Sequence, residues 1–466
     1  MRKNNFLVLA TLLLFACNSN KENNKTAAQL DEYLTAQSTH YRFNGNVLVA
    51  EYGKIVFQKS YGYANFDTNR MLNDSSVFEL ASVSKQFTAT AILLLKDKGK
   101  LKLTDSLRQY FPELPYSGIS IYHMLTHTSG LPDYEEAMNE KWDHGKIAFN
   151  KDMIAFLAKE KLPVLFTPGS KWLYSNTAYA ILASIAEKVS GQSYSDFMAQ
   201  NIFQPLHMSH TRIYNTRRSL KDTIANYAFG FVYNDSLKKN LMPDSVTELK
   251  FVIYLDGIQG DGVVNSTTAD LLKWDRSVKN HTLLSEATQK EMLKEQAMVD
   301  TAKKSHYGFG VFMEKTDLGY VISHSGGWPG YTTFLARNVD KDQTFIVLSN
   351  NSSPSPAITT ALQHILNGKP VVMPYQHKEI NMDSLTLQPF VGKYKATNEI
   401  RLERSGNKLF WVSPNGQKIE LKPESATKFY FSGGYDRQIE FELDTNKKIT
   451  KLWLINYGIK TAFQKI

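Results

Sequence analysis

The alternation of hydrophobic and polar positions predicts a strand-rich beginning that is followed by a buried helix. Residues 27–37 have a helical pattern, and residues 45–50 and 54–58 read as two strands joined by a short turn. The apolar run of residues 87–95 is hydrophobic on nearly all sides, which predicts a helix in the middle of a domain. Gly99 is a suitable residue to end that helix.

The central part of the chain is mostly helical, and strands return after it. Residues 101–249 combine helical periodicity with polar loops. Short strands are predicted at residues 320–323, 331–336 and 344–348, and a helix at residues 356–366. Strands at both ends with helices between them predict one antiparallel sheet with helices packed on its faces. The first hairpin and the last strands are expected to share that sheet.

The last part of the chain has a different character. Residues 369–384 are predicted to be a linker, because they contain Pro370 and Pro374 and few periodic positions. Residues 385–466 consist of short alternating segments, which are typical of a small β-barrel or sandwich. The predicted fold class is α+β over residues 29–368, an antiparallel sheet flanked by helices plus a mostly helical subdomain. A small all-β domain follows it.

Composition excludes two broad classes of protein. The 466 residues are 42% hydrophobic and 12% aromatic, which is ample for a packed core and unlike a disordered chain. The net charge of +9 comes from scattered lysines and arginines, without the basic block that is typical of nucleic-acid binding. We therefore expect no nucleic-acid partner, while a mild attraction to an anionic envelope polymer stays open.

The N-terminus has the features of an export signal. Residues 1–5 are a short basic region, and the apolar stretch after them is about ten residues long, too short to span a bilayer comfortably. Residues 14–17 resemble a bacterial lipoprotein signal with cleavage before Cys17; the alternative is an ordinary secretory peptide that contains a cysteine. We therefore expect a signal peptide over residues 1–17, a flexible tether over residues 18–28, and a lipid anchor that holds the exported protein in the cell envelope.

Neither a metal nor a cofactor is expected. Cys17 is the only cysteine of the chain, so no intramolecular disulfide, cysteine nucleophile or thiolate metal site is available once it is lipidated. His123 and His127 are four residues apart, which is a metal-ligand spacing, but no acidic residue follows His123. A packing role is the preferred interpretation of both histidines.

Ser82 and Lys85 lie three residues apart at the start of the predicted buried helix. On one face of a first helical turn, near the positive end of the helix dipole, a lysine can take or relay the proton of a serine that is otherwise a poor nucleophile. The spacing alone is weak, because it recurs without a suitable context at Ser236…Lys239, Ser405…Lys408 and Ser425…Lys428. The context of Ser82 predicts an acyl-forming nucleophile at the bottom of a cleft.

Two later motifs add to this pair. Tyr174 and Asn176 lie two residues apart in a loop just before a helical pattern, although Tyr63-Ala64-Asn65 has the same form. His324-Ser325-Gly326-Gly327 comes at the end of the strand predicted over residues 320–323. Each motif would be dismissed if it occurred singly.

In this order and spacing, the three motifs resemble the penicillin-recognising serine hydrolases, which include class C β-lactamases, D-Ala-D-Ala carboxypeptidases and related esterases and D-aminopeptidases. The family pattern is Ser-x-x-Lys, then Tyr-x-Asn, then Lys- or His-x-Gly. The resemblance covers residues 30–366, and the C-terminal segment is similar to the small β-domain often appended to these hydrolases. It implies an acyl-enzyme mechanism on D-amino-acid peptides, small esters or amides, without a cofactor.

The resemblance also implies a role for each motif residue. Ser82 would attack a carbonyl, Lys85 would keep the serine proton mobile, and Tyr174 would act as a general base. The backbone N–H groups of Ser82 and Gly327 would form the oxyanion hole. The full set expected to bind substrate or the oxyanion is Asn176, His324, Ser325, Gly326 and Gly327.

His324 departs from most class C β-lactamases, which carry a lysine at this position. Histidine is neutral for much of the time near pH 7 and suits the peptidase and esterase branches better. Two alternatives stay open: a β-lactamase, and a catalytically idle protein that binds cell-wall peptides in the same cleft. The expected partners are a small-molecule or peptide substrate of the peptidoglycan type, and a membrane through the anchor at Cys17.

Overall fold

The computed structural model describes residues 24–215 and 223–466. The predicted signal peptide with Cys17 and the first part of the tether lie outside the described residues. Residues 24–28, which were assigned to the tether, begin a helix over residues 24–41. Within the described ranges, the structure contains no helix that is long and apolar enough to cross a membrane.

Contacts between residues divide the chain into two compact units. The sheet–helix unit is Asn44–Pro356, and the barrel unit consists of Met1–Phe43 together with Ala357–Ile466. The domain boundaries expected from the sequence stay predictions.

The main sheet of the sheet–helix unit has eight antiparallel strands, and strands from the two ends of the unit are neighbours in it. β1 (Gly45–Glu51) pairs with β2 (Lys54–Tyr61) on one side and with β15 (Gln343–Ser349) on the other, with Gly45 opposite Ser349. The prediction that the first hairpin and the last strands share one sheet is confirmed. The sheet continues from β15 through β14 (Tyr331–Asn338), β13 (Gly319–Trp328), β12 (Phe312–Thr316), β11 (Ser305–Tyr307) and β10 (Ala297–Asp300).

β13 is longer than the sequence indicated. It runs to Trp328, which pairs with Tyr331 of β14 across a turn at Pro329 and Gly330. His324-Ser325-Gly326-Gly327 therefore lies inside a strand and not at its end. The two glycines looked like a strand terminus, yet the hairpin turns only at Gly330, where φ is +90°.

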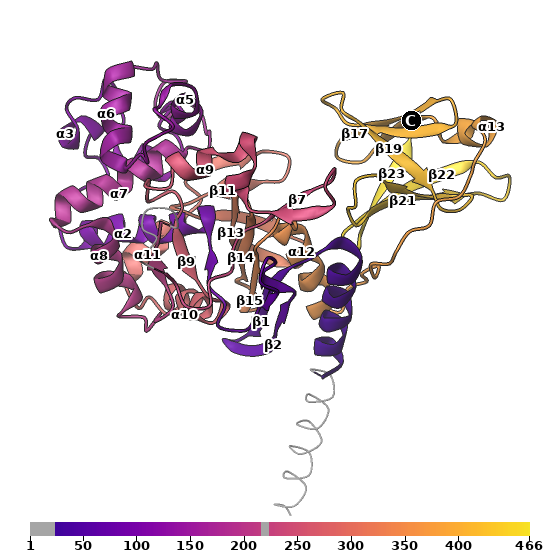
Figure 1. Cartoon of the computed structure of the whole chain (residues 1–466), viewed down its shortest axis with the longest axis horizontal. Helices are drawn as coiled ribbons and strands as arrows, with labels where there is room; N and C mark the ends of the chain where they lie inside the picture. The colour runs from indigo at the N-terminus through magenta and orange to yellow at the C-terminus, as the bar shows by residue number, and fades with distance from the viewer. Residues whose placement is uncertain (1–23, 216–222) are drawn as a thin grey trace, which may run out of the picture. The chain divides into compact units, whose positions relative to one another are not determined.

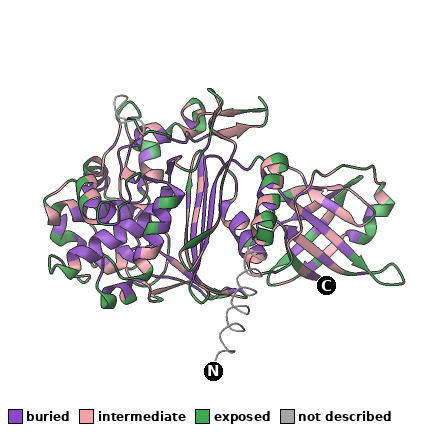
Figure 2. Cartoon of the chain, turned by 90° about the horizontal axis from the view of Figure 1, so that it is seen from below, coloured by how far each residue is buried: buried purple, intermediate pink, exposed green. Residues whose placement is uncertain are grey.

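Helices cover the sheet, and the buried helix predicted from the apolar run is present. α2 (Lys85–Asp97) is buried from its first residue to Leu95, and it packs against α7 (Asn176–Ser190). Ser175 caps α7 by accepting the N–H of Ala178, and Gly191 ends it with a φ of +74°. Figure 1 shows α2 and α7 on one side of the sheet, and Figure 2 shows many buried residues in the helices on that side. The other helices of this unit are α3 (Leu107–Tyr110), α4 (Ile121–Leu125), α5 (Tyr134–Lys141), α6 (Asn150–Glu160), α8 (Tyr194–Met198), α9 (Phe251–Tyr254), α10 (Thr268–Lys279) and α11 (Glu286–Met292).

Short strands support the segment that carries Ser82. β5 (Phe78–Glu79) and β6 (Arg212–Ile213) both pair with β9 (Val264–Ser266) in a three-stranded sheet. Two further hairpins are β3 (Tyr63–Asn65) with β4 (Arg70–Met71), and β7 (Val232–Asn234) with β8 (Lys239–Leu241).

The C-terminal strands form a closed antiparallel barrel, so the predicted barrel or sandwich is a barrel. β16 closes it by pairing with β23, with Tyr394 opposite Lys465. Aromatic side chains such as Trp411, Phe429 and Phe441 fill its core. The strands are β16 (Gly392–Lys395), β17 (Glu399–Ser405), β18 (Lys408–Val412), β19 (Lys418–Pro423), β20 (Lys428–Phe431), β21 (Arg437–Leu443), β22 (Ile449–Asn456) and β23 (Ile459–Lys465); α12 (Ser355–Leu366) and α13 (Ser384–Leu387) precede them.

The helix over residues 24–41 belongs to the barrel unit. Tyr33 donates its hydroxyl to the carbonyl of Tyr457 at 3.1 Å. Gln37 donates an amide N–H to Asp436 at 2.6 Å. The helix over residues 24–41 is thus joined to the C-terminal part of the chain by buried polar contacts.

Candidate active site

Ser82 lies in a single 3-10 turn, η1 (Ala81–Ser84), which leads directly into α2. The carbonyl of Leu80 accepts a hydrogen bond from Thr333 Oγ1 at 2.7 Å, which anchors the turn to β14. Ala81 has a φ of +47°, a conformation that costs a residue with a side chain about 1–3 kcal/mol and persists only where its surroundings enforce it. The serine is therefore held on a rigid, strained turn just before the helix.

Lys85 begins α2 and is completely buried, with 0% of its surface exposed. Its Nζ donates to Ser82 Oγ at 3.2 Å, to Asn176 Oδ1 at 2.8 Å and to the backbone carbonyl of Asp261 at 2.8 Å. All three acceptors are uncharged atoms of a hydroxyl, an amide and a peptide. A buried ammonium that faces neutral acceptors is well placed to exchange a proton with the neighbouring serine.

Tyr174 lies beside this lysine, in the loop just before α7. Lys85 Nζ is 4.8 Å from the centre of the Tyr174 ring, close enough for a cation–π contact. The Tyr174 hydroxyl is buried and has no hydrogen-bond partner among the described residues. An unpaired buried hydroxyl is costly, so this group is available to a substrate, a water molecule or the serine during reaction.

His127 holds the backbone on both sides of Tyr174. Its carbonyl accepts the N–H of Leu173 at 2.9 Å, and its Nδ1 accepts the N–H of Ser175 at 3.0 Å. The His127 and Tyr174 rings lie 4.3 Å apart. Burial, followed by the positive charge of Lys85, lowers the pKa of His127 well below its ordinary value, so the ring is neutral. The packing interpretation of this histidine did not anticipate that it would position the tyrosine.

Two carboxyl groups behind Asn176 were also missed by sequence reasoning. Asn176 donates its amide N–H to Glu135 Oε1 at 2.9 Å, and the carboxyl group of Asp261 accepts the hydroxyl of Tyr134 at 2.8 Å. Burial, then the neighbouring Asp261 charge, raises the pKa of Glu135 to about 8. Glu135 and Asp261 lie far from Ser82 in sequence and belong to none of the three motifs. No pattern in the sequence marks Glu135, and the only sequence signal of Asp261 is its place between Gly260 and Gly262.

His324 is buried, with 1% exposure, in an aromatic setting. Its Nδ1 hydrogen bonds with the carbonyl of Ser325 at 2.7 Å, and its Nε2 with the hydroxyl of Tyr307 at 3.1 Å. Since a carbonyl only accepts, Nδ1 carries the proton and Nε2 accepts from the tyrosine. Burial, followed by the charge of Lys85, lowers the pKa of His324 to about 3. The side chain is therefore neutral and is not positioned as a cation for a substrate carboxylate.

Gly326 and Gly327 have different surroundings. A Cβ atom at Gly326 would lie 2.1 Å from the carbonyl oxygen of Leu80 and 2.3 Å from Thr333 Oγ1, so only glycine lets β13 approach the serine turn. A Cβ atom at Gly327 would meet nothing within 4 Å. Gly327 is exposed and faces open space beside Ser82.

A cavity opens at the serine. Ser82, Asn176, Gly327 and Trp328 are among its lining residues. Its wall also carries four acidic residues: Glu79, Glu135, Asp256 and Asp261. The residues Tyr174, His324 and Ser325 are not among its lining residues. The structure thus brings Ser82, Lys85, Tyr174, Asn176 and Gly327 together, while their catalytic roles stay predictions.

An antiparallel sheet with a helical subdomain, and a Ser-x-x-Lys serine where the two meet, define the β-lactamase and penicillin-binding class of fold. The chain belongs to the Beta-lactamase family, whose model matches residues 30–367.

Similar proteins support this membership. The chain is 40% identical over 412 residues to "Penicillin-binding protein 4*" of Bacillus subtilis, covering 86% of this chain and 91% of the relative. A penicillin-binding protein structure from Bacillus halodurans has a TM-score of 0.63 at 25% identity and covers 72% of this chain and 98% of its own. A D-amino acid amidase structure from Ochrobactrum anthropi has a TM-score of 0.61 at 21% identity over 74% of this chain and 98% of its own, which shows a shared fold.

Proposed function

We propose that this protein is a serine hydrolase that acts through an acyl-enzyme on a peptide, amide or ester carbonyl, with D-amino-acid peptides and small esters as its substrate classes. The observation that carries the proposal is the buried Lys85 ammonium, 3.2 Å from Ser82 Oγ and bonded only to uncharged acceptors. The 40% identity to a protein named as penicillin-binding supports an acyl donor of related chemistry.

In the proposed reaction, Ser82 Oγ forms a bond to the substrate carbonyl carbon. Lys85 takes up the serine proton as it gives one of its own through Tyr174 to the leaving amine or alcohol, whose bond to that carbon breaks. Water then adds to the acyl carbon and returns a proton by the same route, which releases the acid and regenerates the serine hydroxyl. The N–H groups of Ser82 and Gly327 stabilise the oxyanion at each addition, and loss of one such donor costs about 3–4 kcal/mol of barrier.

The carboxyl groups of the cavity favour a substrate that carries a positive charge near the scissile bond. Asp256 contributes a carboxyl group to this wall, and Glu135, whose pKa is raised to about 8, gives up its proton when an ammonium group arrives, so the ammonium gains electrostatic stabilisation. A free α-amine on a D-amino acid amide or peptide has this chemistry. The neutral His324 offers no countercharge for the carboxylate of a β-lactam, which argues against efficient β-lactamase activity.

The test of the catalytic proposal is covalent labelling. A fluorophosphonate or fluorescent penicillin probe is expected to label the wild-type protein and to leave Ser82→Ala unlabelled. Ser405→Ala is a matched control, because Ser405 has the same Ser-x-x-Lys spacing in the barrel unit, and it should be labelled normally. A folded wild-type protein that neither labels nor turns over any substrate would support the non-catalytic binding protein instead.

A substrate panel then separates peptidase, esterase and β-lactamase activities. We expect D-alanine p-nitroanilide, with its free amine, to be hydrolysed at least about tenfold faster than its N-acetyl derivative, which is the ratio given by roughly 1.4 kcal/mol of charge interaction. D-Ala-D-Ala peptides, p-nitrophenyl esters and nitrocefin complete the panel. Preference for the acetylated substrate would contradict the role of the acidic wall.

We also propose that Cys17 carries a lipid that anchors the exported protein to a membrane of the cell envelope. The basis is the sequence at residues 14–17, which resembles a lipoprotein signal. Incorporation of labelled palmitate into the wild-type protein but not into Cys17→Ser is the expected result. Equal incorporation into both proteins would refute the anchor.

A further inference from the structure

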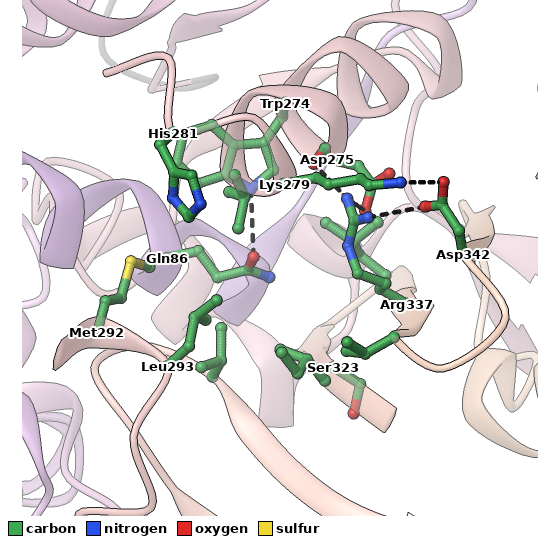
Figure 3. A pocket seen from close by; sticks show the side chains of 15 residues that line it. Gln86, Trp274, Asp275, Lys279, His281, Met292, Leu293, Ser323, Arg337 and Asp342 are labelled. Atoms are coloured by element: carbon green, nitrogen blue, oxygen red, sulfur yellow. Dashed lines mark hydrogen bonds and ion pairs between the residues drawn. The ribbon is translucent and has the colours of Figure 1, made fainter. Parts of the chain in front are cut away.

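A second cavity lies in the sheet–helix unit, and no described residue that lines it also lines the cavity at Ser82. It is enclosed by α2, α10, α11 and the strands β13 and β14, and Figure 3 shows its lining side chains. The cavity encloses about 200 Å³. A buried apolar cavity of about 150 Å³ is large enough to bind benzene, so this space has room for a small organic molecule.

Most of the cavity wall is apolar. Trp274, Met292 and Leu335 are almost fully buried and form its deep part. Val339, with 45% exposure, lies at the opening to solvent. Side chains of this kind attract the hydrophobic part of a ligand, because its burial removes apolar surface from water.

The charged residues of the wall satisfy one another. Arg337 pairs with Asp275 and with Asp342, and Lys279 pairs with Asp342. Arg276 reaches the same two carboxylates at 2.7 and 2.8 Å. Because these ions are already compensated, they leave no strong demand for a charged ligand.

Gln86 differs from them, because half of its amide is unsatisfied. Its Oε1 accepts the indole N–H of Trp274 at 3.2 Å, but its Nε2 is buried without a hydrogen-bond partner among the described residues. The residue is 5% exposed and lines the cavity. Figure 3 shows its amide below Trp274, in the middle of the labelled side chains. Buried amide donors are almost always paired, so a donor of this kind indicates an acceptor that arrives with a ligand.

We propose that this cavity is a binding site for a small, uncharged apolar molecule that carries one hydrogen-bond-accepting oxygen. The hydrocarbon part packs against Trp274, Met292 and Leu335, and the oxygen accepts the N–H of Gln86. The proposal does not depend on the chemistry at Ser82. Gln86 follows Lys85 directly in α2, so the ligand would lie one residue from the catalytic centre along the helix.

The experiment uses two probes of nearly equal shape, 4-phenylbutan-2-one and butylbenzene, titrated into the protein and followed by saturation-transfer NMR. Wild type is expected to bind each at one saturable site, with the ketone about three- to tenfold tighter, the gain from one hydrogen bond. Gln86→Met removes the donor and keeps the side-chain length, so the two dissociation constants should become equal. Val278→Phe, on the cavity wall of α10, fills the space and should weaken both probes at least about tenfold.

Three results would contradict the proposed binding site: no saturable binding of the ketone, equal affinity of wild type for both probes, or unchanged ketone binding in Val278→Phe. The first two are what a water molecule held on Gln86 would produce. Gln86→Met leaves the Trp274 N–H without its acceptor. If that variant fails to fold, the comparison of the two probes on wild type and on Val278→Phe still decides the question.

Discussion

Lys85 is a charged side chain in a place with no exposed surface. Burial of an ammonium is expensive unless its three N–H donors are all satisfied, and Ser82, Asn176 and the Asp261 carbonyl satisfy them. This arrangement gives up the larger stabilisation of a direct carboxylate pair. What it provides is an amine in contact with the serine hydroxyl, which takes up the serine proton as it gives one of its own away.

Replacement of Lys85 should slow acylation strongly without unfolding the protein. Lys85→Met keeps the length and removes the charge, so we expect fluorophosphonate labelling to slow by about 10²–10⁴-fold, the usual contribution of a general acid–base group. The matched control is Lys98→Met at the exposed end of the same helix, which should label at the wild-type rate. If the Lys85→Met protein labelled at the wild-type rate, Lys85 would not take part in acylation.

His127 is expected to act through Tyr174. Its φ of +57° is left-handed, which asparagine tolerates better than most residues, so His127→Asn removes the ring with little backbone strain. We expect labelling to slow at least about tenfold, because Tyr174 loses the ring that packs against it and the Ser175 N–H loses its acceptor. The labelling rate of wild type and variant should be measured from pH 5 to 9.

A change in the shape of this pH profile is the signature of a displaced tyrosine, which a merely destabilised fold would not give. His123→Asn is the matched control, four residues earlier, where the imidazole accepts the Ser120 N–H in the cap of α4. It should leave the profile unchanged. If both substitutions changed the pH profile of labelling equally, His127 would have only a packing role.

At the scale of elements, the site depends on how closely β13 approaches the turn before α2. Gly326 sets that distance, because Leu80 and Thr333 occupy the space that its Cβ atom would need. The strained Ala81 lies in the same contact. Strand, turn and helix are therefore fixed relative to one another before any substrate arrives.

A pair of adjacent substitutions tests this contact. Gly326→Ala places a methyl group 2.1 Å from the Leu80 carbonyl oxygen, so β13 or the turn must move; we expect a loss of about 1–3 kcal/mol in unfolding free energy and slower labelling. Gly327→Ala meets nothing within 4 Å and should change the unfolding free energy by less than about 0.5 kcal/mol. Thermal and urea unfolding of the two variants provide the comparison. Equal stability of both would show that the strand has room to move.

At the scale of the whole molecule, the main architecture follows from pattern alone. Apolar runs predicted β1, β15 and α2 because these elements are buried along nearly their whole length. The predicted end of β13 was wrong, because Gly326 and Gly327 interrupt the hydrophobic pattern but stay paired with β14. His127, Glu135 and Gln86 could not be assigned, since their roles arise from contacts with residues distant in sequence. Local periodicity carries no information about such contacts.

The contact between Gln37, in the helix over residues 24–41, and Asp436 predicts a pH effect on stability. Burial raises the pKa of Asp436 from 3.8 to about 6, so between about pH 4 and 6 the folded protein holds a proton that the unfolded chain has lost. The unfolding free energy therefore falls as pH rises through this window, by up to about 3 kcal/mol at about 1.4 kcal/mol for each pKa unit. Asp436→Asn removes the titration and still accepts from Gln37, so its stability should exceed that of wild type at pH 7 and approach it at pH 4.

Urea unfolding at pH 4, 5, 6 and 7 measures this difference. Asp444→Asn, in an exposed turn of the same barrel unit, is the control and should follow the wild-type curve. A constant difference between Asp436→Asn and wild type at all four pH values would mean that the pKa of Asp436 is the same in the folded and the unfolded protein.

The pairing of β16 with β23 has a consequence for how copies of this protein behave when crowded. Flat sheets end in strands whose free amides and carbonyls recruit further strands, and this is how many β-rich chains polymerise. A ring of strands has no first or last member, so the C-terminal module presents no such template to its neighbours. Many copies can therefore be present at high density without forming fibres by strand pairing between their barrels.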